Sequence, residues 1–167
     1  DTASTRNVPR YFFVGNHGFE LEQRADEVGI AQPRVGTNLH GITVNEHGLL
    51  LAGLEGCMRY NPSAWFQYSE NDMWLQALNL APRLMMNRLR YGRYLDVLVT
   101  HAPAFGIHDQ PDRAHTGFKS FLWLLRTFRP RYLLHGHIHV YNRNQVVATR
   151  YHQTDVINVY PHRVIEV

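Results

Sequence analysis

Leu133-Leu134-His135-Gly136-His137-Ile138-His139 is the stretch that decides the fold expected for this chain, because a short apolar strand leads there into a cluster of histidines. The large apolar side chains before His135 favour a buried strand, and Gly136 permits a sharp turn at its end. His137 and His139 are two residues apart, so on extended chain their imidazoles point to one side, as two ligands of one metal centre would. Polar loops contain the same spacing, and the metal interpretation therefore depends on the rest of the chain.

Two other apolar segments also end in residues that can bind a metal. Residues 11–14 lead into Gly15-Asn16-His17-Gly18, and residues 94–100 lead into His101. The carboxyl ends of parallel strands share one edge of an α/β sheet, where ligands bind. We therefore expect Asn16 and His101 to converge with His137 and His139 on a borderline divalent metal. Histidine in general titrates near neutral pH, so His17 is a candidate general acid. In isolation, the segment around Asn16 is equally well explained as an ordinary turn.

Composition restricts the classes of protein to which this chain can belong. Its 167 residues suffice for one domain with a substantial core, and no apolar run is long enough to span a membrane. Cys57 is the single cysteine, which excludes a disulfide framework and a thiolate metal cage and is typical of the reducing cytoplasm. The 17 basic residues are spread along the sequence, so no dense basic run indicates nucleic-acid binding.

Hydrophobic periodicity predicts alternating strands and helices. The expected helices comprise residues 20–28, 70–91 and 117–128. Pro82 should divide the second helix in two or kink it, Gly92 should end it, and Thr116 should cap the third helix. The expected strands comprise residues 11–14, 41–45, 49–54, 94–100, 132–134, 145–151, 155–160 and 163–167, the last three as a meander that completes a second sheet.

Three motifs taken in order resemble those of the calcineurin-like metallophosphoesterase superfamily. They are GNH at residues 15–17, THAP at residues 100–103 and GHIH at residues 136–139. The flanking segments LLLAGLEGCMRYNP, VLVTHAPAFGIHDQPDRAHTGF, RPRYLLHGHIHVY and DVINVYPHRVIEV are similar to a bacterial branch of that superfamily. The resemblance covers essentially the whole chain.

This resemblance implies a fold and an activity. The expected fold is α/β, a two-sheet α-β-β-α sandwich of the metallophosphoesterase type, and residues 1–167 would be the C-terminal part of that single domain. The expected activity is hydrolysis of a phosphomonoester or phosphodiester substrate by a metal-activated hydroxide at a centre of two Mn, Fe or Zn ions. Neither the substrate nor the oligomeric state follows from the motifs.

The resemblance also assigns roles to particular residues. Asn16, His101 and His137 would ligate the second metal, and His139 would ligate the first. His17 would donate a proton to the leaving group or stabilise the phosphate. The loop histidines after the THAP motif, His108 and His115, would line the phosphate pocket, with an ordinary polar role in the loop as the alternative.

Two departures from the family pattern favour an alternative function. The Asp-x-His and Gly-Asp-x-x-Asp motifs, which supply most ligands of the first metal, do not occur before Gly15. We therefore expect the sequence to begin between the second and third motifs, without the first strands of the sandwich. The second departure is Gly18, where the family usually has an acidic residue beside the catalytic histidine. The alternative is a non-catalytic protein of the same fold with an incomplete metal site, and a mononuclear metal protein of another class is a third possibility.

Replacing Gly18 with the acid usual in the family tests the second departure. A carboxylate at this position would orient His17 and stabilise its imidazolium form, so Gly18→Asp should raise the turnover number of the full-length enzyme. Glu20 or Glu55 could already fill this role. Steady-state kinetics on a phosphate ester measures the effect, and an unchanged or lower turnover number would contradict the expectation.

Overall fold

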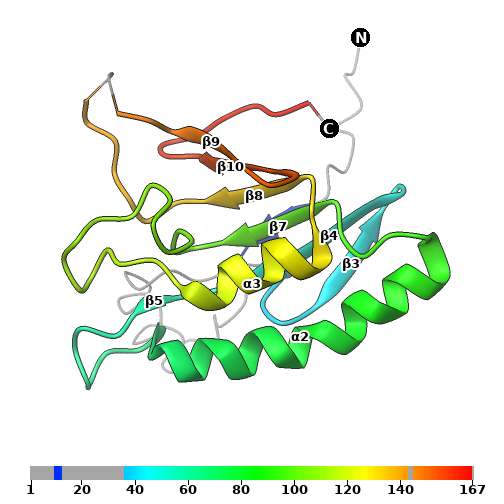
Figure 1. Ribbon diagram of the computed structural model, residues 1–167, viewed down its shortest axis with the longest axis horizontal. Helices are drawn as coiled ribbons and strands as arrows, with labels where there is room; N and C mark the ends of the chain where they lie inside the picture. Colours follow the sequence, from blue (N-terminus) through cyan, green and yellow to red (C-terminus); the bar gives the residue numbers. More distant parts are fainter. Residues whose placement is uncertain (1–9, 13–35, 143–144, 167) are drawn as a thin grey trace, which may run out of the picture.

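A six-stranded sheet forms the centre of the computed structural model, which describes residues 10–12, 36–142 and 145–166. Its strands follow the order β3-β4-β7-β8-β10-β9 (Figure 1). The inner strands β4, β7, β8 and β10 run parallel, and the edge strands β3 and β9 run antiparallel to their neighbours. The strands are β3 (Thr43–Glu46), β4 (Leu49–Leu54), β7 (Val97–Thr100), β8 (Tyr132–His135), β9 (Ala148–Tyr151) and β10 (Thr154–Asn158). The expected α/β class is confirmed.

Two short parallel pairs flank the main sheet. One joins β1 (Tyr11–Phe12) to β2 (Thr37–Asn38), and the other joins β5 (Cys57–Met58) to β6 (Gln67–Tyr68). The expected strand at residues 11–14 is therefore described over its first two residues only. Residues 13–35, which include the expected helix at residues 20–28, lie outside the described part of the chain.

Helix α2 (Glu70–Tyr91) is one continuous helix, so the division at Pro82 into two helices was wrong. Pro82 lies on the exposed side of α2, where water can satisfy the carbonyl that loses its hydrogen bond. Strong ends support the helix. Ser69 and Asp72 form a reciprocal capping box, and Gly92 ends the helix in the left-handed conformation with φ of 76°.

Helix α3 (Lys119–Phe128) begins two residues later than expected, and its cap comes from elsewhere in the chain. The hydroxyl of Thr116 donates to the carbonyl of Asp112 instead of capping the helix. The carboxylate of Glu70, at the start of α2, accepts from the backbone N–H groups of Lys119 at 3.0 Å and Ser120 at 2.8 Å. A negative charge is favourable at a helix N-terminus, so this contact stabilises α3 and ties the two helices together.

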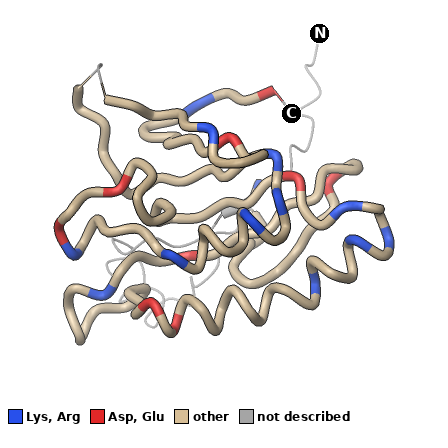
Figure 2. Tube along the Cα trace, in the orientation of Figure 1, with Lys and Arg blue, Asp and Glu red and all other residues tan. Residues whose placement is uncertain are grey.

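Both helices cover the same face of the sheet (Figure 1). The core on that face combines side chains of α2 and α3 with those of Leu98, Leu133 and Val156 from the central strands. The opposite face carries a smaller apolar cluster that includes Leu39 and Val97. The described helices contain no segment long and apolar enough to cross a bilayer. Acidic and basic residues are interspersed along the described chain, as Figure 2 shows.

The C-terminal strands differ from the expected meander. β9 and β10 extend the main sheet instead of forming a second one, because β10 pairs in parallel with β8. Of the expected strand at residues 163–167, residues 163–166 are described and have no strand pairing. Arg163 instead donates from Nε to the carbonyl of Asn158 at 3.0 Å, which turns this segment back toward the end of β10.

Gly53 on β4 provides a test of the packing between the sheet and the segment before β3. A Cβ atom at Gly53 would lie 2.7 Å from the Cβ of Leu39, a buried contact that cannot move aside freely. Gly53→Ala should lower the free energy of unfolding by about 1–3 kcal/mol, measured by urea denaturation. Gly136→Ala is the matched control, since no atom lies within 4 Å of the added Cβ, and its stability should not fall. Equal losses in both variants would contradict this packing argument.

Candidate metal centre

The carboxyl ends of β7 and β8 bring two of the expected metal ligands together. The parallel register pairs Thr100 with His135, so the residues that follow these strands are neighbours. The backbone N–H of Gly136 donates to the carbonyl of His101 at 3.1 Å. The ring centroids of His101 and His137 are 4.7 Å apart. The expected convergence of strand ends is therefore present for this pair.

His137 has the hydrogen bonding of a metal-binding histidine. Its Nε2 lies 2.8 Å from the carbonyl oxygen of Ala114, which can only accept, so Nε2 carries the proton. The lone pair of the neutral ring is then on Nδ1. Histidines that bind metals usually donate their other N–H in this way, which fixes the orientation of the ring. The neutral ring of His137 therefore presents Nδ1 as its acceptor atom.

His115 joins the same group from the loop that precedes α3. Its ring centroid is 5.1 Å from that of His137. Its Nδ1 lies 2.8 and 2.9 Å from the two carboxylate oxygens of Asp112. Desolvation would raise the pKa of Asp112, but the hydrogen bonds from His115 outweigh it and lower that pKa. The pair places an imidazole beside His137.

His139 is located differently from the other histidines of its motif. Its ring stacks on Tyr160 with centroids 4.3 Å apart, and its Nδ1 is 2.9 Å from the hydroxyl of Tyr141. The contacts of the described residues do not include it in the group formed by His101, His115 and His137.

The other predicted ligands are not described. Asn16 and the expected general acid His17 lie within residues 13–35, outside the described part of the chain. Within the described ranges, no group of three or more His, Cys, Asp or Glu side chains is arranged to hold a metal ion.

A further histidine, His135, was not singled out from the sequence. It is fully buried at the end of β8, and burial lowers its pKa to about 4. Its Nε2 lies 2.9 Å from Nδ1 of His108, a residue expected in the phosphate pocket. The sequence does contain one signal for the burial of His135. Side chains alternate between the two faces of a strand, so His135 lies on the same buried side of β8 as Leu133.

A buried carboxylate, Glu55, lies at the same edge of the sheet. The register pairs Leu54 with Thr100, so Glu55 follows β4 where His101 follows β7. Glu55 is 6% exposed. One of its oxygens lies 3.7 Å from Nε2 of His40 and 3.5 Å from the hydroxyl of Tyr68. The other oxygen is buried without a hydrogen-bond partner in the described part of the structure. The side chain of His40 is 28% exposed and faces this carboxylate.

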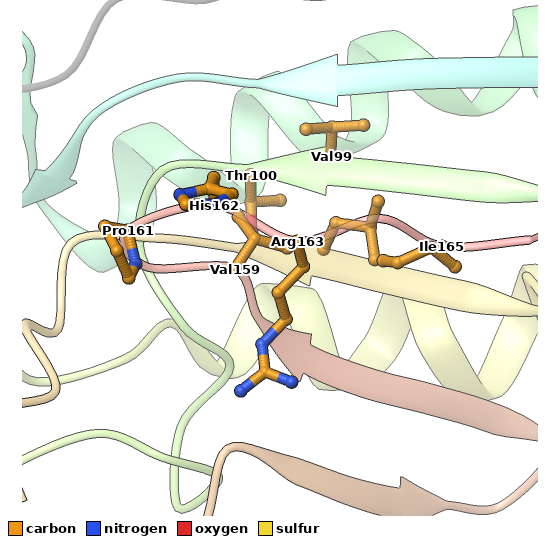
Figure 3. A pocket seen from close by; sticks show the side chains of 8 residues that line it. Val99, Thr100, Val159, Pro161, His162, Arg163 and Ile165 are labelled. Atoms are coloured by element: carbon orange, nitrogen blue, oxygen red, sulfur yellow. The ribbon is translucent and has the colours of Figure 1, made fainter. Parts of the chain in front are cut away.

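A cavity of about 480 Å³ borders this region on the sheet face opposite the helices. Its walls come from β7, with Val99 and Thr100, and from residues of the segment 159–165 (Figure 3). Leu134 and Ile165 line both this cavity and an adjacent one of about 220 Å³. This face of the sheet is therefore only partly covered by the described residues.

Comparison with known proteins establishes the fold alone. No protein-family model matches the sequence, and no curated protein is significantly similar to it. The chain is 17% identical to TT1561 of Thermus thermophilus, with a TM-score of 0.55 over 92% of this chain and 63% of that one. A second solved structure is 14% identical, with a TM-score of 0.55 over 89% of this chain and 56% of that one. The chain thus spans less than two thirds of the length of both.

Asn158 connects the histidine motif to β10. It is 1% exposed, and its Nδ2 donates to the carbonyl of Ile138 at 2.8 Å. Its Oδ1 accepts from the backbone N–H of Tyr160 at 3.0 Å. The amide therefore holds the segment between His137 and His139 against the sheet.

Exchanging this amide for a carboxylate tests the connection. Asn158→Asp would place two acceptors opposite each other, so the free energy of unfolding should fall by about 1–3 kcal/mol at pH 7. The control is Asn45→Asp, because the Oδ1 of Asn45 only accepts from Gly48 in an exposed turn and a carboxylate can do the same. Its change should stay within about 0.5 kcal/mol in the same urea titration. A similar loss in both variants would contradict the role given to Asn158.

Proposed function

We propose that this protein is a metal-dependent phosphoesterase that hydrolyses a phosphomonoester or phosphodiester. The observation that carries the proposal is the pairing of His101 and His137 at adjacent parallel strand ends, with ring centroids 4.7 Å apart. The orientation of His137, which donates from Nε2 to a backbone carbonyl, supports it further. The order of the GNH, THAP and GHIH motifs supplies the reaction class.

The proposed centre holds two divalent ions, Mn, Fe or Zn. Asn16, His101 and His137 would hold one of them, and His139 would contribute to the other. When bound, such ions polarise the phosphoryl group and lower the pKa of a bound water to roughly 7–9.

Two further histidines, His17 and His115, would act on the substrate directly. His17 would donate a proton to the leaving-group oxygen, since imidazole titrates near neutral pH. His115 would stabilise a phosphate oxygen, and its contacts with Asp112 and His137 support this role.

The finer fold belongs to the same proposal. A two-sheet sandwich would require the sheet face opposite the helices to pack against a second layer. The apolar cluster around Leu39 and Val97 and the two cavities on that face support such packing. We propose that residues 1–167 are the C-terminal part of one metallophosphoesterase domain. The buried Cys57 supports a cytoplasmic location, because a lone thiol is typical of a reducing compartment.

A non-catalytic protein of the same fold is the second candidate. The contacts of His139 with Tyr141 and Tyr160 favour it, because they engage this imidazole with other side chains. Gly18, in place of the family's usual acid, favours it as well. Such a protein would bind a partner or a single metal through the His101–His137 pair without hydrolysing an ester.

Elemental analysis of the purified protein, with turnover of p-nitrophenyl phosphate and bis-p-nitrophenyl phosphate on the same sample, separates the two candidates. The phosphoesterase should contain about two metal ions per chain and hydrolyse one of these esters. One ion or none, without turnover after Mn²⁺ is added, would support the binding protein and overturn the enzyme.

Two asparagine substitutions sharpen this experiment. His137 and His47 both adopt positive φ, 62° and 49°, which asparagine tolerates well. His137→Asn should bind less metal, and its turnover number should fall by at least about 100-fold. This fall exceeds the one expected when only a hydrogen-bond partner of a metal ligand is removed. His47→Asn removes an imidazole that is 90% exposed and should match the wild type in both measurements. Equal behaviour of the two variants would exclude His137 as a ligand.

A further inference from the structure

Three side chains form a chain of hydrogen bonds behind the candidate metal ligands. His108 lies in the loop after β7, His135 ends β8, and Thr149 belongs to β9. Nε2 of His108 is 2.8 Å from the hydroxyl of Thr149, and Nδ1 of His108 is 2.9 Å from Nε2 of His135. Nδ1 of His135 is 3.1 Å from the carbonyl oxygen of Gly136. We refer to Thr149, His108 and His135 as the imidazole chain.

The acceptor at one end sets the direction of every hydrogen bond in the imidazole chain. The Gly136 carbonyl can only accept, so Nδ1 of His135 carries a proton. His135 is fully buried, which favours the neutral ring, so its Nε2 accepts from Nδ1–H of His108. The hydroxyl of Thr149 then donates to Nε2 of His108. Both histidines are therefore in the tautomer with the proton on Nδ1.

The imidazole chain ends on the peptide that orients His137. The Gly136 carbonyl also accepts from the backbone N–H of Ile138 at 2.7 Å, and the Gly136 N–H donates to the His101 carbonyl at 3.1 Å. The first of these bonds is made by the peptide that joins Gly136 to His137, and the second by the peptide before it. His137 itself has a φ of 62°, which is unfavourable for a residue with a Cβ. His108 has the same φ of 62°. A residue keeps such a strained backbone conformation only when the surrounding contacts hold it in place. Conformations of this kind are common at functional sites.

We propose that the imidazole chain positions the imidazole of His137 for metal binding, and that His108 is a positioning residue. This inference rests on the proposed metal centre. It gives His108 a role different from the phosphate contact expected from the sequence, since both ring nitrogens of His108 are engaged within the protein. Loss of any member would leave the peptide before His137 less constrained and weaken the metal site without removing a ligand.

The first test does not depend on activity. Long-range nitrogen–proton correlation NMR on the ¹⁵N-labelled full chain distinguishes the two neutral tautomers of each histidine. The signals of His135 and His108 are assigned by their loss in His135→Asn and His108→Asn. Both rings should carry the proton on Nδ1. A proton on Nε2 of either ring in its neutral form would overturn the imidazole chain.

The second test measures the affinity for Mn²⁺ by calorimetry on the full chain. His108→Asn should weaken it about 10–100-fold, as removal of the outer partners of a ligand does. Thr149→Val, which replaces the hydroxyl with a methyl group, should weaken the affinity for Mn²⁺ less than His108→Asn does. Thr149→Ser keeps the hydroxyl and should bind Mn²⁺ with the wild-type affinity. His152→Asn is the control, because His152 is exposed and has a similar φ of 53°. It should bind Mn²⁺ like the wild type.

The outcomes separate this inference from the proposed function. A wild-type protein that binds no Mn²⁺ refutes the metal centre and, with it, the positioning role. A wild type that binds Mn²⁺ with the same affinity as His108→Asn and Thr149→Val overturns the positioning role alone. A rise in KM for the phosphate ester in His108→Asn, with unchanged Mn²⁺ affinity, would assign His108 to the substrate and also overturn it.

Discussion

Parallel pairing between β7 and β8 is the constraint on which the candidate metal centre depends. Because Thr100 is in register with His135, the two strands end together, and their following residues begin the site from adjacent positions. A shift of one residue would move every side chain of a strand to the opposite face. His135 would then leave the core, and the hydrogen bond from Gly136 to the His101 carbonyl would be lost. The register of the sheet therefore also determines the geometry of the histidines.

The site combines an unfavourable backbone with well-satisfied polar groups. His137 has a left-handed φ, and its ring is held by a hydrogen bond to Ala114 and by ring contacts with His101 and His115. Nearby polar groups of His135 and Asn158 are buried and hydrogen-bonded. Satisfied polar networks of this kind specify one conformation, because each lost bond leaves a buried group without a partner. Glu55, with one oxygen unpartnered in the described structure, is the exception at this edge.

The two faces of the sheet differ in how completely they are covered. On one face, α2 and α3 enclose a continuous core, and Glu70 of α2 supplies the cap for α3. On the other face, a smaller cluster is bordered by two cavities that share Leu134 and Ile165. The candidate centre lies at the carboxyl edge of the parallel strands, the edge where ligands bind in open α/β sheets.

Local sequence by itself determined the alternation of elements and much of the candidate site. The apolar runs before His101 and His135, the hairpin around residues 46–48, and Gly92 as a helix end were all predictable, because each depends on near neighbours in the chain. The convergence of His101 and His137 followed from one general property of parallel sheets.

Only the tertiary structure decided the features that depend on contacts between distant residues. Pro82 stays within one helix because caps at both ends and packing of the buried side outweigh one missing hydrogen bond. Glu70 replaces Thr116 as the cap of α3 from 49 residues away. The partners of His108, at sequence separations of 27 and 41 residues, have no local signal either. The physical reason is that a side chain's hydrogen-bond partners are set by where the folded chain brings other segments, and spacing along the sequence does not contain that information.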